Sequence, residues 1–191
     1  MPGEGKTWVS SNLATTFAQA GKKVAIIDAD MRKGNLSSIF KTKTIPGLSN
    51  FLSNIDENGK SGEVDIAKCI KTTEIDNLFL IPAGNIPPNP SELLSSDRTI
   101  TLLNNLKDFF DIIILDGTPS LIVTDSLILS RLVDSTLIVA AHNSTKKSNL
   151  EKLKKDIENV GGKISCINKD IKELLDYLNN KYEPDTKLVE E

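Results

Sequence analysis

The sequence predicts an α/β fold with a doubly wound, mainly parallel sheet and helices on both faces of that sheet. Two observations support this prediction. Several short runs are continuously apolar, which is typical of strands buried on both faces, and they cover residues 24–28, 78–82, 111–116, 135–141 and 163–168. The stretches between these runs are long enough for the helical crossovers that parallel strands need.

Length and composition indicate a globular protein. The 191 residues carry 23 basic and 26 acidic side chains, a net charge of −3, so charge gives no reason to expect a nucleic-acid partner. The longest apolar region, residues 121–141, contains Asp125, Arg131 and Asp134, too many charges for a membrane helix. Cys69 and Cys166 match no metal or redox spacing, so we expect buried thiols and a cytoplasmic location.

Two helices are predicted from the spacing of apolar residues. Residues 7–20 show the first pattern, which stops at Gly21, a suitable C-terminal cap. Residues 149–160 show the second, with apolar side chains three and four positions apart. The periodicity is weak over 33–75, where no regular element is predicted.

The chain opens with a glycine-rich stretch, "PGEGKT", directly before the first predicted helix. Glycines let backbone N–H groups converge on phosphate oxygens, and the helix N-terminus favours an anion there. Lys6 can reach terminal phosphates, and the Thr7 hydroxyl can bind Mg²⁺. The strand that normally precedes such a loop is not in the sequence, so we expect the first strand to be missing and its two neighbours to keep unpaired ladder groups.

Acidic residues end two of the predicted strands. In "VAIIDAD", Asp28 and Asp30 are two positions apart and therefore point to the same side of an extended chain. In "DIIILDGTP", Asp116 ends the strand and is suited to hold Mg²⁺. Because parallel strands present their carboxyl ends at one edge of the sheet, all three acids are expected to face the phosphate loop.

The order of these motifs resembles the bacterial tyrosine kinases that regulate capsule and exopolysaccharide synthesis, a family within the P-loop partitioning-ATPase-like superfamily. The resemblance covers about residues 1–170 and is carried by "PGEGKT", "VAIIDADMRKGN", "GLSNFLS", "FDIIILDGTPSLIVTDS" and "GGKISCINK". Its most discriminating part is "GNIPPNPSELLSS", which the partitioning and septum-site ATPases do not share. After "DADMRK" such kinases usually carry proline, whereas this sequence has Gly34, a change expected to loosen the segment.

The resemblance implies a role for each motif residue. One acid of the second motif accepts the proton of the attacking tyrosine, a role we assign to Asp28, and Asp30 helps to place Mg²⁺. The expected catalytic residues are Lys6, Asp28, Asp30 and Asp116, and the expected metal ligands are Thr7, Asp30 and Asp116. The residues expected to contact ATP are Gly3, Glu4, Gly5, Lys6, Thr7, Trp8 and Asn168, although Trp8 also suits a packing role.

The resemblance also implies a domain plan and partners. Residues 1–170 would form the ATP-binding kinase domain, incomplete at its start, and 171–191 a tail whose Tyr182 and Tyr177 accept phosphate. Such kinases act between subunits of a ring, and a membrane-spanning partner activates them at the inner face of the membrane. Two alternatives stay open at this point: a partitioning or division ATPase that switches as a dimer, and a truncated, non-catalytic copy that serves as a scaffold.

Overall fold

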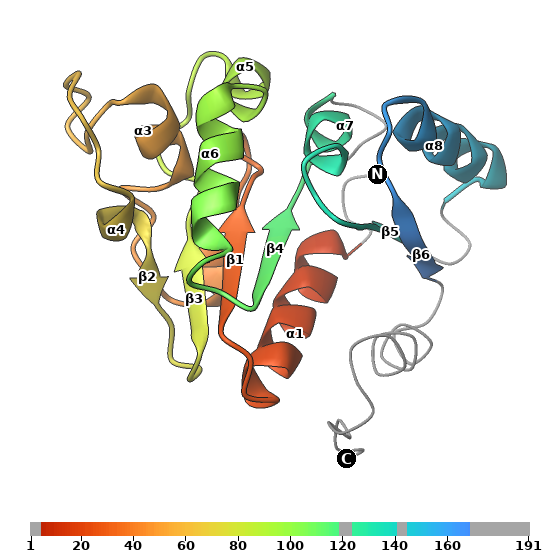
Figure 1. Cartoon of the computed structure of the whole chain (residues 1–191), viewed down its shortest axis with the longest axis horizontal. Helices are drawn as coiled ribbons and strands as arrows, with labels where there is room; N and C mark the ends of the chain where they lie inside the picture. Colours follow the sequence, from red (N-terminus) through yellow and green to blue (C-terminus); the bar gives the residue numbers. More distant parts are fainter. Residues whose placement is uncertain (1–4, 119–123, 141–144, 169–191) are drawn as a thin grey trace.

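A computed structural model describes residues 5–118, 124–140 and 145–168 and confirms the predicted α/β architecture (Figure 1). Each of the five predicted runs contains a strand whose ends agree with the prediction to within two residues. The strands are β1 (Val24–Asp28), β2 (Lys71–Thr72), β3 (Leu78–Ile81), β4 (Ile112–Asp116), β5 (Thr136–Val139) and β6 (Ile164–Asn168).

The strands form two sheets. The larger has the order β2-β3-β1-β4, with β1 parallel to both β3 and β4, and the smaller pairs β5 with β6 in parallel. The short strand β2 was not predicted, since it has no apolar run of its own; it is antiparallel to the edge of β3. The sequence predicts two strands that each keep unpaired backbone N–H and C=O groups along one edge. Within the described residues, β4 pairs only with β1, and β5 pairs only with β6.

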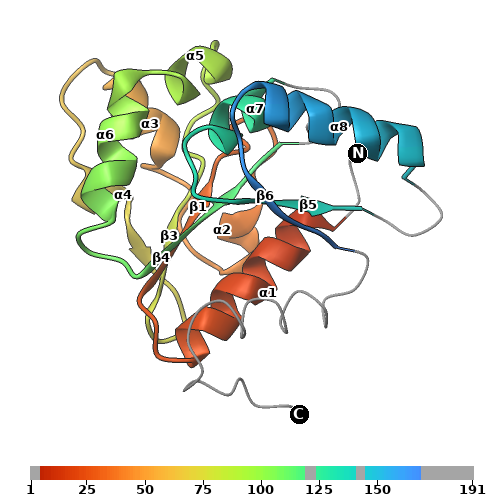
Figure 2. The same cartoon turned by 45° about the vertical axis from the view of Figure 1, so that its right-hand side comes forward.

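Helices cover both faces of the larger sheet, as Figure 2 shows. The alternation of β1 explains the two layers, because its side chains point to opposite faces in turn. Val24 and Ile26 pack with α1 (Lys6–Gln19) and α2 (Leu36–Ile39). Ala25 and Ile27 pack into the opposite cluster, to which the remaining helices of this sheet contribute: α3 (Leu48–Ser53), α4 (Ile66–Cys69), α5 (Pro90–Leu94), α6 (Asp97–Leu106) and α7 (Asp125–Ser130).

Both predicted helices are present. The first, α1, ends as expected beside Gly21, which has φ 83°, a left-handed conformation that glycine adopts without steric cost. The second is α8 (Lys147–Asn159), whose Leu153 and Ile157 pack with Ile138 of β5. Weak periodicity over 33–75 hid three helices, α2, α3 and α4, because each has only four to six residues and is held by tertiary contacts.

Cys69 is the last residue of α4 and is buried, as predicted for a structural thiol. Burial raises the pKa of this thiol to about 11, so it stays protonated and unreactive near neutral pH. Cys166 lies in β6, and its side chain is outside the described part.

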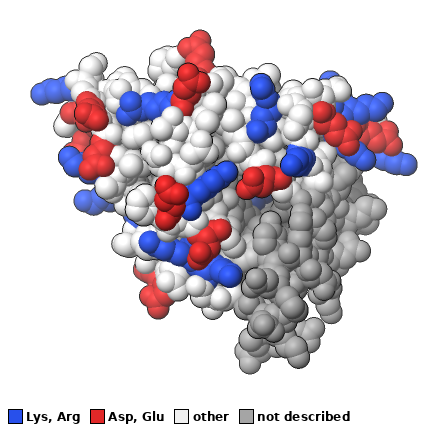
Figure 3. All heavy atoms as spheres, in the orientation of Figure 1, with Lys and Arg blue, Asp and Glu red and all other residues white. Residues whose placement is uncertain are grey.

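The visible surface mixes charges of both signs. In Figure 3, acidic and basic side chains are interspersed over the described face. None of the helices in the ranges described above is long and apolar enough to cross a membrane.

Candidate functional site

Two buried acids lie side by side at the carboxyl ends of β1 and β4. Asp28 and Asp116 are register partners in the parallel ladder and are only 1% and 4% exposed. Asp28 is two and four positions after Ile26 and Val24, so its side chain points to the same face of the sheet as theirs, the face covered by α1. Sheet register and side-chain alternation therefore bring together two carboxylates that are far apart in sequence.

The N-terminus of α1 places a cation near Asp116. Gly5 has φ 83° and immediately precedes Lys6, the first residue of the helix. Burial lowers the pKa of Lys6, while the nearby carboxylates of Asp116 and Asp30 favour its charged form. The structure thus brings Lys6 close to two of the predicted acids. Gly3 and Glu4 of the same loop lie outside the described residues.

Hydroxyl groups on α1 hold Asp116. Ser10 Oγ donates to Asp116 Oδ1 at 2.8 Å, and the Thr7 side chain also forms a hydrogen bond with this carboxylate. Burial raises the pKa of Asp116, and the two hydroxyl contacts oppose this shift. Sequence reasoning missed Ser10, although its position three residues after Thr7 places it on the same side of the helix.

Asp28 has one satisfied oxygen and one without a partner. Its Oδ2 accepts a hydrogen bond from the backbone N–H of Leu36 at 3.0 Å. Its Oδ1 is buried and has no hydrogen-bond partner within the described residues. Burial raises the pKa of Asp28 to about 7, and the charges of Asp116 and Asp30 add to the shift. An unsatisfied carboxylate oxygen of this kind fits a cation or a proton donor brought by a ligand.

Asp30 is held by the turn that follows it. Its Oδ1 accepts hydrogen bonds from the backbone N–H groups of Arg32, at 3.2 Å, and Lys33, at 2.9 Å. The charge of Asp30 raises the pKa values of Lys6, Asp28 and Asp116. All four predicted catalytic side chains therefore belong to one electrostatic cluster.

The protein residues suit Mg²⁺ only together with further oxygen ligands. Across the described ranges, no group of three or more His, Cys, Asp or Glu side chains could hold a metal ion by itself. Mg²⁺ commonly binds one or two carboxylates and takes its other ligands from water and phosphate oxygens. Thr7, Asp30 and Asp116 fit that pattern, and the partnerless Oδ1 of Asp28 leaves unmet negative charge beside them.

Gly34 has a packing role against Asp28. A Cβ added to Gly34 would lie 2.6 Å from Asp28 Oδ2 and 2.7 Å from its Oδ1, closer than real Cβ contacts. A side chain at position 34 would therefore push against the carboxylate that accepts the hydrogen bond from Leu36.

Gly34→Ala is expected to displace the Asp28 carboxylate and destabilise the protein by about 1–3 kcal/mol, because a buried hydrogen bond is lost. Urea unfolding measures this change. Gly62→Ala is the matched control, since a Cβ there meets nothing within 4 Å; it should stay within about 0.5 kcal/mol of the parent protein. Equal unfolding midpoints for the two variants would contradict the packing role.

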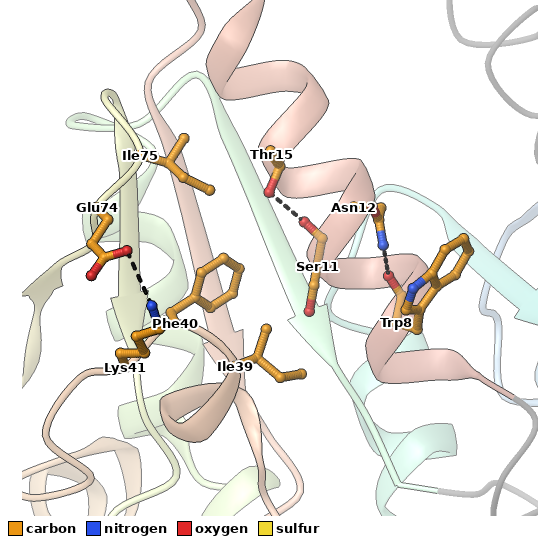
Figure 4. Close-up of a pocket in the computed structure, with 9 residues that line it drawn as sticks. All are labelled: Trp8, Ser11, Asn12, Thr15, Ile39, Phe40, Lys41, Glu74 and Ile75. Carbon is orange, nitrogen blue, oxygen red and sulfur yellow. Dashed lines mark hydrogen bonds and ion pairs between the residues drawn. The ribbon is translucent and has the colours of Figure 1, made fainter.

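Trp8 lies beside a groove on the α1 face, shown in Figure 4. The side chain is 57% exposed. The groove has a volume of about 440 Å³ and is also lined by Ile39, Phe40 and an ion pair between Lys41 and Glu74, with 3.7 Å between Nζ and Oε2.

Three other predicted site residues are not tested by the described coordinates. Asn168 ends β6, but its side chain is not described. Tyr177 and Tyr182 lie outside the described residues.

Comparison with known proteins identifies the family of this chain. Residues 2–173 match the family model of an AAA domain. The chain is 37% identical over 161 residues to the tyrosine-protein kinase CpsD of Streptococcus pneumoniae, an alignment that covers 84% of this chain and 67% of CpsD. The chain belongs to the bacterial tyrosine-protein kinase family.

Solved structures agree with this membership. The kinase domain of the Escherichia coli tyrosine kinase ETK superposes with a TM-score of 0.79 at 34% identity, covering 86% of this chain and 61% of that one. The cell division ATPase MinD of Pyrococcus furiosus superposes with a TM-score of 0.66 at 24% identity, a likeness of fold alone. This tyrosine-kinase family member therefore spans about two thirds of the length of CpsD and somewhat less of the ETK kinase domain.

Proposed function

We propose that this protein is a Mg-ATP-dependent protein-tyrosine autokinase that regulates capsular or extracellular polysaccharide biosynthesis. One observation carries the proposal: Lys6 at the N-terminus of α1 lies near Asp116 and Asp30, and Asp28, whose pKa both of these acids raise, has a buried oxygen without a partner in the described structure. Family membership supports the kinase reaction, and the stretch "GNIPPNPSELLSS" supports the link to polysaccharide synthesis.

The residues of the site have separate roles in this proposal. The N–H groups before α1 and the ammonium group of Lys6 bind the phosphates of ATP and neutralise charge on them. Thr7, Asp30 and Asp116 hold Mg²⁺, which when bound supplies further charge neutralisation on the phosphate oxygens. Phosphoryl transfer needs mainly this positioning and charge stabilisation, so no covalent intermediate with the protein is required.

Asp28 is the proposed general base. A base works best when its pKa lies near the working pH, and burial raises the pKa of Asp28 to about 7. Its Oδ2 is fixed by Leu36, which leaves Oδ1 to accept a proton from a tyrosine hydroxyl.

The wider assembly follows from the family resemblance. We propose that residues 1–170 act as the kinase domain and that residues 171–191 carry the acceptor tyrosines. The proposed partners are further copies of the chain, arranged as a ring, and a transmembrane protein that controls polysaccharide chain length and activates the kinase. The protein would then lie in the cytoplasm, at the inner face of the membrane through that partner.

Incubation with radiolabelled ATP and Mg²⁺, followed by phosphoamino-acid analysis, tests the proposed reaction. Labelled phosphotyrosine on the protein is the expected result. Release of labelled phosphate without phosphotyrosine would instead indicate a switch ATPase, and neither product would indicate a non-catalytic scaffold.

The same assay distinguishes the two candidate acceptors. Tyr182→Phe is expected to lower labelling more than Tyr177→Phe, because Tyr182 is next to Glu183 and Pro184 in the sequence, whereas the spacing of Tyr177 from Leu174 and Leu178 favours packing. The double variant should lose nearly all of the label. Undiminished labelling of the double variant would show that the tail is not the substrate.

A further inference from the structure

A buried carboxylate outside the proposed phosphate site joins three segments of the chain. Asp125 is the first residue of α7 and is 0% exposed. Its Oδ2 accepts a hydrogen bond from Arg32 Nη1, and its Oδ1 accepts one from Ser91 Oγ. Arg32 follows β1, and Ser91 lies in the first turn of α5, within the stretch "GNIPPNPSELLSS". A turn and two helices therefore meet at one side chain.

Arg32 connects this carboxylate to the acids of the proposed site. While its guanidinium group contacts Asp125, its backbone N–H donates to Asp30 at 3.2 Å. The same turn continues to Leu36, whose N–H donates to Asp28 at 3.0 Å. Asp28 and Asp30, two of the three catalytic carboxylates, are thus oriented by backbone groups of residues 32–36.

The turn lies mostly at the surface. Its residues 32–35 are exposed, and only its flanking residues Met31 and Leu36 are buried in the core. The Arg32 side chain is 37% exposed, whereas Asp125 is inaccessible. An ion pair with a buried carboxylate contributes little net stability because the carboxylate loses water, but it restricts the geometry of the groups that it joins. Ser91 satisfies the second oxygen and so limits Asp125 to one orientation.

We propose that Asp125 is a positioning residue for phosphoryl transfer: through Arg32 it fixes the turn whose backbone N–H groups orient Asp28 and Asp30. Ser91 holds Asp125 in this role, which gives the "GNIPPNPSELLSS" stretch a contact with the site. The inference rests on the proposed kinase function only for its consequence in catalysis; the connection between the side chains and the turn stands independently of it.

Amide hydrogen exchange tests the connection without nucleotide. Arg32→Gln is expected to speed exchange at the amides of Arg32, Lys33 and Leu36 at least about tenfold, because the turn opens more often. Arg131→Gln is the matched control, since Arg131 is an exposed arginine at the other end of α7. Unchanged protection of the three amides in Arg32→Gln would overturn the proposal.

Nucleotide binding tests the consequence. The affinity for a fluorescent ADP analogue is measured with Mg²⁺ and with EDTA, in Asp125→Asn, Arg32→Gln and the double variant. The expected result is that each single variant loses at least about tenfold of the Mg²⁺-dependent gain in affinity but keeps the affinity seen in EDTA. The double variant should be no worse than either single variant, because both changes break one connection.

Other outcomes are equally decisive. Equal losses with Mg²⁺ and with EDTA, or additive effects in the double variant, would overturn the positioning role. Asp97→Asn, which removes an exposed acid from the first turn of α6, controls for the loss of a helix-terminal charge. If Asp125→Asn does not fold, the Arg32→Gln variant alone tests the positioning role, since the Arg32 side chain is partly exposed. If the parent protein binds no nucleotide, the proposed function fails, and amide exchange alone decides the connection.

Discussion

Lys6→Met is expected to lower phosphotyrosine formation roughly 10²–10³-fold, the loss typical when one preorganised charge-stabilising group is removed. Methionine has about the length of the lysine side chain but no charge. The Lys6 ammonium group lies near Asp116 and Asp30, where it would offset their repulsion toward incoming phosphates. Its removal leaves the acids facing a triphosphate with one fewer positive charge.

The measurement is the initial rate of label transfer from radiolabelled ATP, with urea unfolding to establish that the variant is folded. Lys147→Met is the matched control, because Lys147 is also the first residue of a helix but its side chain is 91% exposed and pairs with Glu151 at 3.9 Å, one turn further along α8. It should keep the parent rate. A folded Lys6→Met protein that labels at the parent rate would show that the proposed phosphate site is wrong.

Asp28→Asn is expected to stabilise the protein above neutral pH while it removes phosphoryl transfer. Burial raises the pKa of Asp28 from its usual 3.8 to about 7, so between these values the folded state holds a proton that the unfolded state releases. Stability therefore falls as pH rises through this window, by about 1.4 kcal/mol per pH unit and about 4 kcal/mol in total. Asparagine keeps an acceptor for the Leu36 N–H but has no charge to bury.

Urea unfolding of both proteins at pH 4 and pH 8 measures this effect. The two should have similar stability at pH 4, and Asp28→Asn should be more stable by about 4 kcal/mol at pH 8. Asp108→Asn, which removes an exposed acid, controls for net charge. A stability difference that does not depend on pH would contradict the raised pKa, and undiminished phosphotyrosine formation would rule out Asp28 as the base.

The two main predictions concern Lys6 and Asp28, which the sequence predicts to lie at the same edge of the sheet. Continuous apolar runs located β1 and β4, and the alternation of side chains along a strand put Asp28 on one face. The rule that parallel strands present their carboxyl ends at one edge then predicted that Lys6 meets the acids, which the structure confirms for Asp116 and Asp30. These inferences depend on local periodicity and on general topology, which a sequence displays directly.

Other features have no local pattern that would reveal them. Asp125 stood out in the sequence only as a charge that excludes a membrane helix, and its contact with Arg32 joins residues 93 positions apart. Gly34 suggested a looser turn, and no sequence pattern indicated that its missing Cβ leaves space for the Asp28 carboxylate. Ser10 reaches across 106 positions to Asp116.

The sequence by itself therefore determined the α/β class, the main strands and the placement of the acids at the edge of the sheet. Only the tertiary structure decided which side chains orient those acids, because such contacts depend on how separate loops pack against one another, and packing between distant segments leaves no periodic mark on the sequence.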